Sequence, residues 1–177
     1  MAENETPVMS MLRGPDWRFQ DLSEHDQQRI NDFQHQTPLH GHLDFRMIEA
    51  SRDGVRARMP VAAPACNATG NLHGGAIATL IDFSAGTCAA IGSGFVPGEQ
   101  TLVTADMHVR YLGRPRGDFV DAVSTIVRSG RTLIIVDCQV VDPEGRVVAV
   151  ADFSAMVVDL RQALKPELTT DPSGPDI

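Results

Sequence analysis

The chain has 177 residues, of which 42% are hydrophobic, and this length suits a single domain with a sizeable core. Its formal net charge of -8 weighs against binding to bulk nucleic acid or to an anionic membrane, because both require a cationic surface. Three cysteines without C-x-x-C spacing argue against a disulfide framework and against a zinc site. The N-terminus leads into no apolar segment, and apolar stretches are far shorter than a membrane span, so we expect a cytoplasmic protein.

Both ends of the chain differ in composition from its middle. Residues 1–36 are polar and form an N-terminal extension, in which Ser23 precedes acidic residues and predicts the start of a short helix. Residues 161–177 are rich in Pro, Gly and Asp toward their end and are predicted to form a disordered tail. The predicted domain is therefore 37–160.

Within this domain, period-2 alternation predicts two strands, at 42–50 and 54–61, joined in a hairpin by a turn at 51–54. Four further segments alternate in the same way and are separated by turn sequences: 101–112, 118–128, 131–142 and 146–158. We expect these four strands to form a meander.

Between the two groups of strands, apolar residues recur at helical spacing from Gly74 to Ile91 and predict one long helix. This order of elements predicts an α+β domain in which the helix packs on an antiparallel sheet of about six strands. The opposite face of the helix carries small residues around Asp82, a poor residue for a helix interior because its side chain competes for backbone hydrogen bonds. A solvated face or a hydrogen bond to a loop would explain Asp82, as would a catalytic role.

A glycine pair, Gly74 and Gly75, follows His73 at the start of this helix. The N–H groups of a first helical turn are unpaired, and with no side chain to block approach they resemble an oxyanion hole in outline. Two glycines equally suit a tight turn and close packing, and the histidine could be a capping or core residue.

The spacing Asn-x5-His-Gly-Gly-x6-Asp, from Asn67 to Asp82, resembles the signature of hotdog-fold thioesterases of the phenylacetate-pathway (PaaI-like) type, which include the human thioesterase superfamily members. The resemblance continues at 103–112 and 127–132 and covers about residues 38–158. It implies a hotdog fold, hydrolysis of acyl-CoA thioesters without a cofactor other than the substrate's own CoA, and a homodimer that pairs into a homotetramer.

The same resemblance implies a role for each residue of the motif. The backbone N–H of Gly74 would bind the thioester carbonyl, and Asn67 would help to polarise it. Asp82 would act as general base on water or as nucleophile, assisted by the hydroxyl of Thr104. In this family the site lies between subunits, so the carboxylate would face the glycine of the other chain.

An acidic protein needs a local basic patch to bind the phosphates of CoA. Arginines cluster at the end of one predicted strand and flank a tight turn, although solvated turn arginines would explain any single one of them. Together with the residues around the glycine pair, the predicted substrate-binding positions are His73, Gly75, Arg110, Arg128, Gly130 and Arg131.

Two other functions remain open at this point. One is a non-catalytic module that binds or senses acyl-CoA, and the other is an enoyl-thioester hydratase, whose usual Asp/His motif is not found. Residues 1–36 are too short and too acidic for a helix-turn-helix with a basic recognition face. The acyl group, whether aryl-acetyl or aliphatic, is not determined by the sequence.

Overall fold

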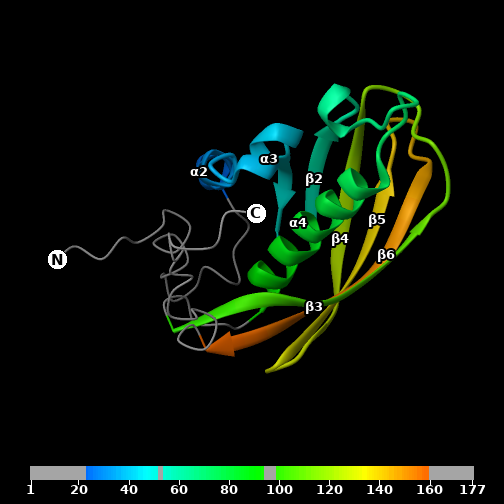
Figure 1. Cartoon of the computed structure of the whole chain (residues 1–177). Helices are drawn as coiled ribbons and strands as arrows, with labels where there is room; N and C mark the ends of the chain where they lie inside the picture. Colours follow the sequence, from blue (N-terminus) through cyan, green and yellow to red (C-terminus); the bar gives the residue numbers. More distant parts are fainter. Residues whose placement is uncertain (1–22, 52–53, 94–98, 160–177) are drawn as a thin grey trace, which may run out of the picture.

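The computed structural model describes residues 23–51, 54–93 and 99–159 (Figure 1). The predicted tail and most of the predicted extension lie outside the described residues. The sheet consists of β1 (Arg46–Ala50), β2 (Val55–Pro60), β3 (Gln100–Tyr111), β4 (Phe119–Ser129), β5 (Leu133–Val141) and β6 (Val147–Asp159). Its helices are α2 (Glu24–Gln34), α3 (Pro38–Leu43), the 3-10 turn η2 (Ala63–Ala65) and α4 (Gly74–Gly92).

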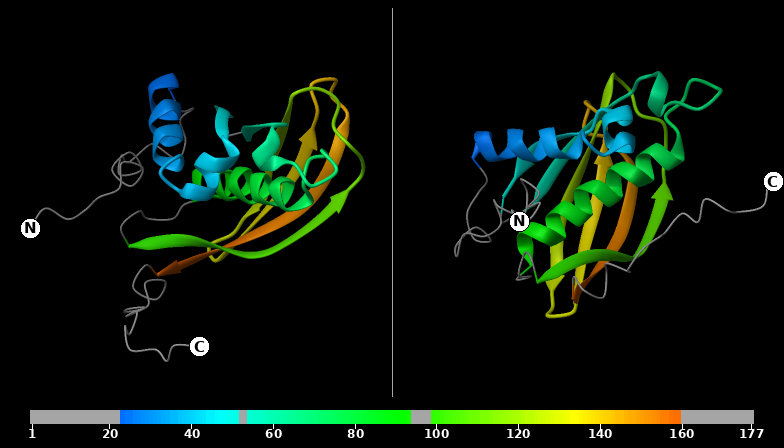
Figure 2. Two further views of the ribbon diagram at one scale, coloured as in Figure 1. Left: turned by 45° about the horizontal axis from the view of Figure 1, so that its top comes forward. Right: turned by 60° about the vertical axis from the view of Figure 1, so that its left-hand side comes forward.

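One long helix, α4, packs against a curved antiparallel sheet with the strand order β1-β2-β4-β5-β6-β3, as Figure 2 shows. This is the predicted α+β hotdog architecture. α2 and α3 lie near the β1 edge, and β3 forms the opposite edge (Figures 1 and 2). As predicted, α2 begins directly after Ser23, whose carbonyl accepts the N–H of Gln27 at 2.9 Å.

The apolar stripe of α4 holds the helix on the sheet. Residues such as Leu80 and Ile81 are fully buried against the inward side chains of the strands. The stripe also contains Ser84, which is buried without cost because its hydroxyl bonds the Ser124 hydroxyl at 2.8 Å. Among the described helices, α4 has a length and composition that would allow a membrane span, but 56% of that window is buried inside the fold, as in the core helix of a globular domain.

The first strand begins later than the alternation predicts. Residues 42–45 do not extend β1, because Pro38–Leu43 form the short helix α3. Proline is favoured in the first helical turn, where its missing N–H has no partner to lose. Asp44, with φ 52°, ends α3 in the left-handed conformation, and the hairpin of β1 and β2 follows as predicted.

The expected meander is wrong for one strand. β4, β5 and β6 are consecutive neighbours, but β3 pairs with β6 and not with β4. Both edges of β4 are already occupied, by β2 and by β5, so β3 cannot pair with β4 and instead pairs with the outer edge of β6. This crossover makes β3 an edge strand and brings its inward side chains to α4.

The turn between β5 and β6 is organised by one buried carboxylate. Asp142 accepts the backbone N–H groups of Arg116, Glu144 and Arg146 at 3.0, 3.1 and 3.0 Å, and also the Arg146 side chain at 3.3 Å. These bonds, the one from Arg116 foremost, hold the pKa of Asp142 below its ordinary value.

We expect Asp142→Asn to lower the midpoint of thermal unfolding at pH 7 by several degrees. Because the native pKa is depressed, the carboxylate stabilises the fold fully above the unfolded pKa of about 3.9. This contribution disappears as the pH falls through the lower native value. Melting curves at pH 7 and pH 3 should therefore show a gap between wild type and variant that closes in acid; a constant gap would contradict the role. Substitution of the exposed Asp137 by Asn is the matched control.

Candidate active site

The start of α4 leaves one backbone donor available. His73 is the N-cap, and its Nδ1 accepts the Gly75 N–H at 2.8 Å. This bond places the proton of a neutral imidazole on Nε2 and uses the Gly75 donor within the fold. The Gly74 N–H has no hydrogen-bond partner in the described part of the chain. Of the two glycines expected at the site, Gly74 is thus the one that can offer an N–H to a ligand.

The loop before α4 orients the side chain of Asn67. Its Oδ1 accepts the Thr69 N–H at 3.0 Å, the Thr69 hydroxyl at 2.8 Å and the Asn71 N–H at 3.1 Å. The carboxamide oxygen is therefore committed to the loop. The exposed amide NH₂ makes no hydrogen bond among the described residues, so it faces solvent as a donor.

Asp82 lies half-buried on the small-residue flank of α4, in contact with the neighbouring strand. The Thr104 hydroxyl, on β3, donates to Asp82 Oδ1 at 2.8 Å. The second carboxylate oxygen has no hydrogen-bond partner among the described residues. The strand crossover thus brings together two of the predicted catalytic side chains, with one carboxylate oxygen fixed and the other open.

Gly74 and Asp82 do not meet within one chain. They lie eight residues apart on a straight helix, which separates them by roughly 12 Å along its axis. A reacting carbonyl must lie about 3 Å from a donor N–H and close to the attacking group. A single chain therefore presents two halves of a site that face different positions along α4.

The predicted arginines lie at two separate locations, and neither location is next to Asp82 of the same chain. Arg110 is on the outer face of the sheet and lies 3.7 Å from Asp152. Arg128, Gly130 and Arg131 line a hollow of about 350 Å³ at the β4–β5 turn. By strand register this turn is three strands from Thr104, roughly 14 Å across the sheet.

Comparison with known proteins places the chain in a family. A model of the thioesterase superfamily matches residues 69–149, which include α4, β3, β4 and β5. A protein of Halobacterium salinarum, described provisionally as an esterase, is 36% identical over 110 residues, which are 59% of this chain and 72% of that protein. The chain belongs to the thioesterase superfamily. The comparisons therefore support a thioester hydrolase.

Solved structures of superfamily proteins have the same fold. A thioesterase of Haemophilus influenzae aligns with a TM-score of 0.71 at 20% identity, over 80% of this chain and 96% of that one. PaaI of Escherichia coli, from the phenylacetic acid degradation operon, aligns with a TM-score of 0.63 at 17% identity, over 74% and 91%. A Bacillus halodurans protein solved with CoA aligns with a TM-score of 0.54 at 29% identity, over 58% and 66%.

Two residues that lie beside the candidate site are not predicted from the sequence. The hydroxyl of Tyr111 donates to the Gly74 carbonyl at 3.0 Å, so the end of β3 supports the first turn of α4. His40, on α3, lies with its ring 5.4 Å from that of Phe83, the residue after Asp82. Burial lowers the pKa of His40 against the opposing effect of the Asp82 carboxylate. The inward alternation of β3 could have indicated Tyr111, whereas nothing in the sequence relates α3 to Asp82.

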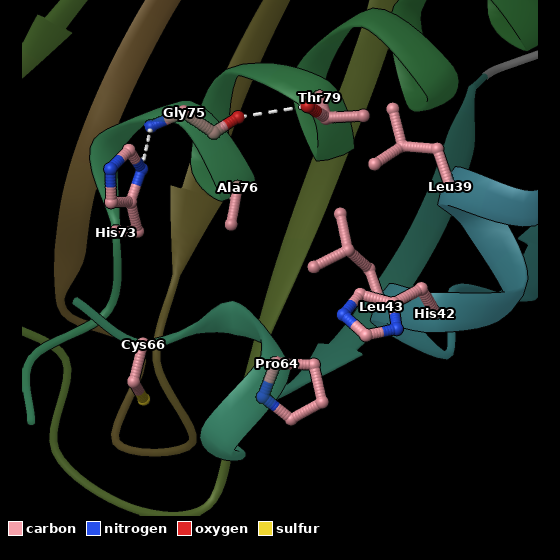
Figure 3. A pocket seen from close by; sticks show the side chains of 9 residues that line it. All are labelled: Leu39, His42, Leu43, Pro64, Cys66, His73, Gly75, Ala76 and Thr79. Carbon is pink, nitrogen blue, oxygen red and sulfur yellow. Dashed lines mark hydrogen bonds between the residues drawn. The ribbon is translucent and has the colours of Figure 1, made fainter.

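A hollow of about 340 Å³ adjoins the start of α4 (Figure 3). In this view the first two turns of α4 lie above the hollow, α3 lies to its right and η2 lies below it. The residues lining it are Leu39, His42, Leu43, Pro64, Cys66, His73, Gly75, Ala76 and Thr79. Of the predicted site residues, His73 and Gly75 border this hollow.

Substitution by alanine should lower the stability of the fold more at Gly75 than at Gly74. A Cβ on Gly75 would lie 2.9 Å from His73 Nδ1 and displace the cap, whereas a Cβ on Gly74 would make an ordinary 3.4 Å contact with the Tyr111 ring. Since an N-cap is worth about 1 kcal/mol, Gly75→Ala should be about that much less stable than Gly74→Ala in urea unfolding. Equal stabilities would show that the His73 cap does not hold the helix start.

Proposed function

We propose that the protein hydrolyses acyl-CoA thioesters to the free acid and CoA, with Asp82 as general base or nucleophile. The observation that carries this proposal is the 2.8 Å hydrogen bond from Thr104 to Asp82 on the open flank of α4. Membership of the thioesterase superfamily supports the reaction class. The relative solved with CoA, at 29% identity, supports CoA as the thiol part of the substrate.

The residues suit thioester chemistry. A thioester carbonyl has little resonance stabilisation and the CoA thiolate is a good leaving group, so a carboxylate and positioned donors suffice. As general base, Asp82 takes a proton from a water that attacks the carbonyl carbon. As nucleophile, it attacks that carbon itself and forms a mixed anhydride, which water then hydrolyses to the free acid and the restored carboxylate. The Gly74 N–H and the Asn67 NH₂ stabilise the developing oxyanion, and the C–S bond breaks to release CoA.

The 12 Å separation of Gly74 and Asp82 favours a site shared by two subunits. β3 is a twelve-residue edge strand, and a long edge strand presents unpaired backbone groups to a second chain. Pairing of two β3 strands about a two-fold axis would place the α4 helices beside each other. Gly74 of one chain and Asp82 of the other would then contact the same thioester.

The outer face of the sheet supports a further association into a homotetramer. Val103, Met156 and Leu133 are neighbours across three strands by register and are 39%, 39% and 42% exposed. An exposed apolar cluster of this kind is typical of a protein interface. We place the contact between two dimers here.

The hollow with Arg128 and Arg131 is the better candidate for the CoA phosphates. Both cations are exposed and form no ion pair in the described part of the chain, so their charge is available. Arg110 is partly neutralised by Asp152 and is the weaker candidate.

Removal of the Asp82 carboxylate should lower turnover severely, and removal of the Thr104 hydroxyl should lower it less. We expect Asp82→Asn to lower kcat for acyl-CoA hydrolysis about 10²–10⁴-fold, the usual contribution of a general base. Thr104→Val should lower it about 5- to 20-fold, since one hydrogen bond to a charged group is lost. Steady-state thiol release measures both, with size-exclusion elution as the check on assembly. A folded Asp82→Asn protein with wild-type turnover would exclude this role.

Gly74→Pro removes only the donor. His73 has φ -72° and ψ 132°, an extended conformation that a following proline favours, and proline fits the first helical position. We expect kcat to fall about 10²–10³-fold, as for an oxyanion-hole donor. Gly74→Ala keeps the N–H and is the matched control, with a much smaller loss.

A mixture of chains tests the shared site. Co-expressed Asp82→Asn and Gly74→Pro chains form mixed dimers in which one of the two shared sites keeps both groups. Random pairing should restore about a quarter of wild-type activity. Activity no higher than that of the two variants measured separately would place the site within one chain.

A further inference from the structure

We infer that the hollow between α3, η2 and the start of α4 binds the acyl group, and that α3 sets the acyl preference of the enzyme. This inference rests on the proposed hydrolysis of acyl-CoA. It goes further by naming where the acyl group binds and which chemical class of acyl group fits.

The hollow is adjacent to the reacting group. His73 and Gly75, which border it, are the chain neighbours of Gly74, the proposed donor to the thioester carbonyl. Gly75 and Thr79, one turn apart, also lie on the same helical flank as Asp82. An acyl chain attached to a carbonyl at Gly74 would therefore extend toward the hollow, which His73 and Gly75 border (Figure 3).

Its lining suits an acyl group and not the CoA arm. Leucine, proline, alanine and cysteine side chains make up much of the wall, and no Arg or Lys contributes. The polar Thr79 hydroxyl is already used, since it donates to the Gly75 carbonyl at 2.8 Å. Phosphates would find no Arg or Lys here, whereas the hollow with Arg128 and Arg131 offers two arginines.

The volume of the hollow suits an acyl group larger than acetyl. A cavity of about 150 Å³ holds one benzene molecule, so about 340 Å³ accommodates an aromatic ring on a short tether or an aliphatic chain of similar bulk. A short acyl group such as acetyl would leave most of the hollow empty. We therefore assign aryl-acetyl or medium-length aliphatic thioesters as substrates.

The far wall belongs to a segment outside the family match. α3, η2 and Cys66 precede residue 69, where the superfamily match begins. Apart from Asn67, the proposed reacting groups Gly74, Asp82 and Thr104 lie in the matched segment, whereas the acyl preference would depend on the preceding one. This gives the helix α3 a defined role at the site.

Leu39 is the residue with which to test this wall. It is 52% exposed, so its substitution leaves the core intact. We expect Leu39→Trp to lower kcat/KM for hexanoyl- and phenylacetyl-CoA about tenfold or more, with acetyl-CoA unchanged within about twofold. Ile48→Trp, at an exposed apolar residue of β1 outside the hollow, is the control and should change none of the three.

Alkylation of Cys66 can report whether an acyl group occupies the hollow, without relying on turnover. It is half-buried in the hollow, whereas burial of Cys88 and Cys138 raises their thiol pKa values to about 12 and about 11 and keeps them unreactive. In Asp82→Asn protein, hexanoyl-CoA should slow alkylation of Cys66 by N-ethylmaleimide at least about fivefold, and acetyl-CoA should not. Peptide mass spectrometry locates the adduct.

The outcomes separate the two levels of the proposal. If wild-type protein releases no thiol from any acyl-CoA, the proposed function fails. If it does, but Leu39→Trp affects all three substrates equally or both acyl-CoAs protect Cys66 alike, the acyl group binds elsewhere and only this assignment falls. The assignment is supported if Leu39→Trp loses activity only toward hexanoyl- and phenylacetyl-CoA and if hexanoyl-CoA, but not acetyl-CoA, protects Cys66.

Discussion

The structure depends on one constraint: a single helix, α4, must bury an apolar stripe in the concave face of one sheet. That burial is the largest favourable term available to a domain with one helix in its core. It fixes the rotation of the helix about its axis. With Leu80 and Ile81 against the sheet, the flank with Gly75 and Asp82 is held half-open.

The same constraint explains how a carboxylate is tolerated in the middle of a core helix. At the border of the buried stripe, Asp82 keeps access to solvent on one side and receives a hydrogen bond from Thr104 on the other. A fully buried carboxylate without a partner would be strongly disfavoured, and a fully exposed one would not be oriented. The helix start shows a similar division. The Gly75 donor is used for the cap and the Gly74 donor is left for a ligand.

The site is built from elements with different tasks. α4 and β3 carry the proposed reacting groups in a segment shared with the superfamily, and α3 and η2 add a wall that precedes this segment. The arginine-lined turn of β4 and β5 lies apart from these elements, three strands from Thr104 by register. A division of this kind lets substrate preference change without disturbing the helix on which the chemistry depends.

The sequence by itself determined the elements that have a strong local pattern: α4 with the glycine pair at its start, the β1–β2 hairpin, and the motif from Asn67 to Asp82. Periodicity and turn chemistry act within a few residues, so they can be detected without the fold. Only the tertiary structure decided that β3 pairs with β6, that α3 replaces the start of β1, and that Tyr111 and His40 reach the site. These outcomes depend on which sheet edge is free and which surfaces must be buried, and such competition among distant segments leaves no local pattern in the chain.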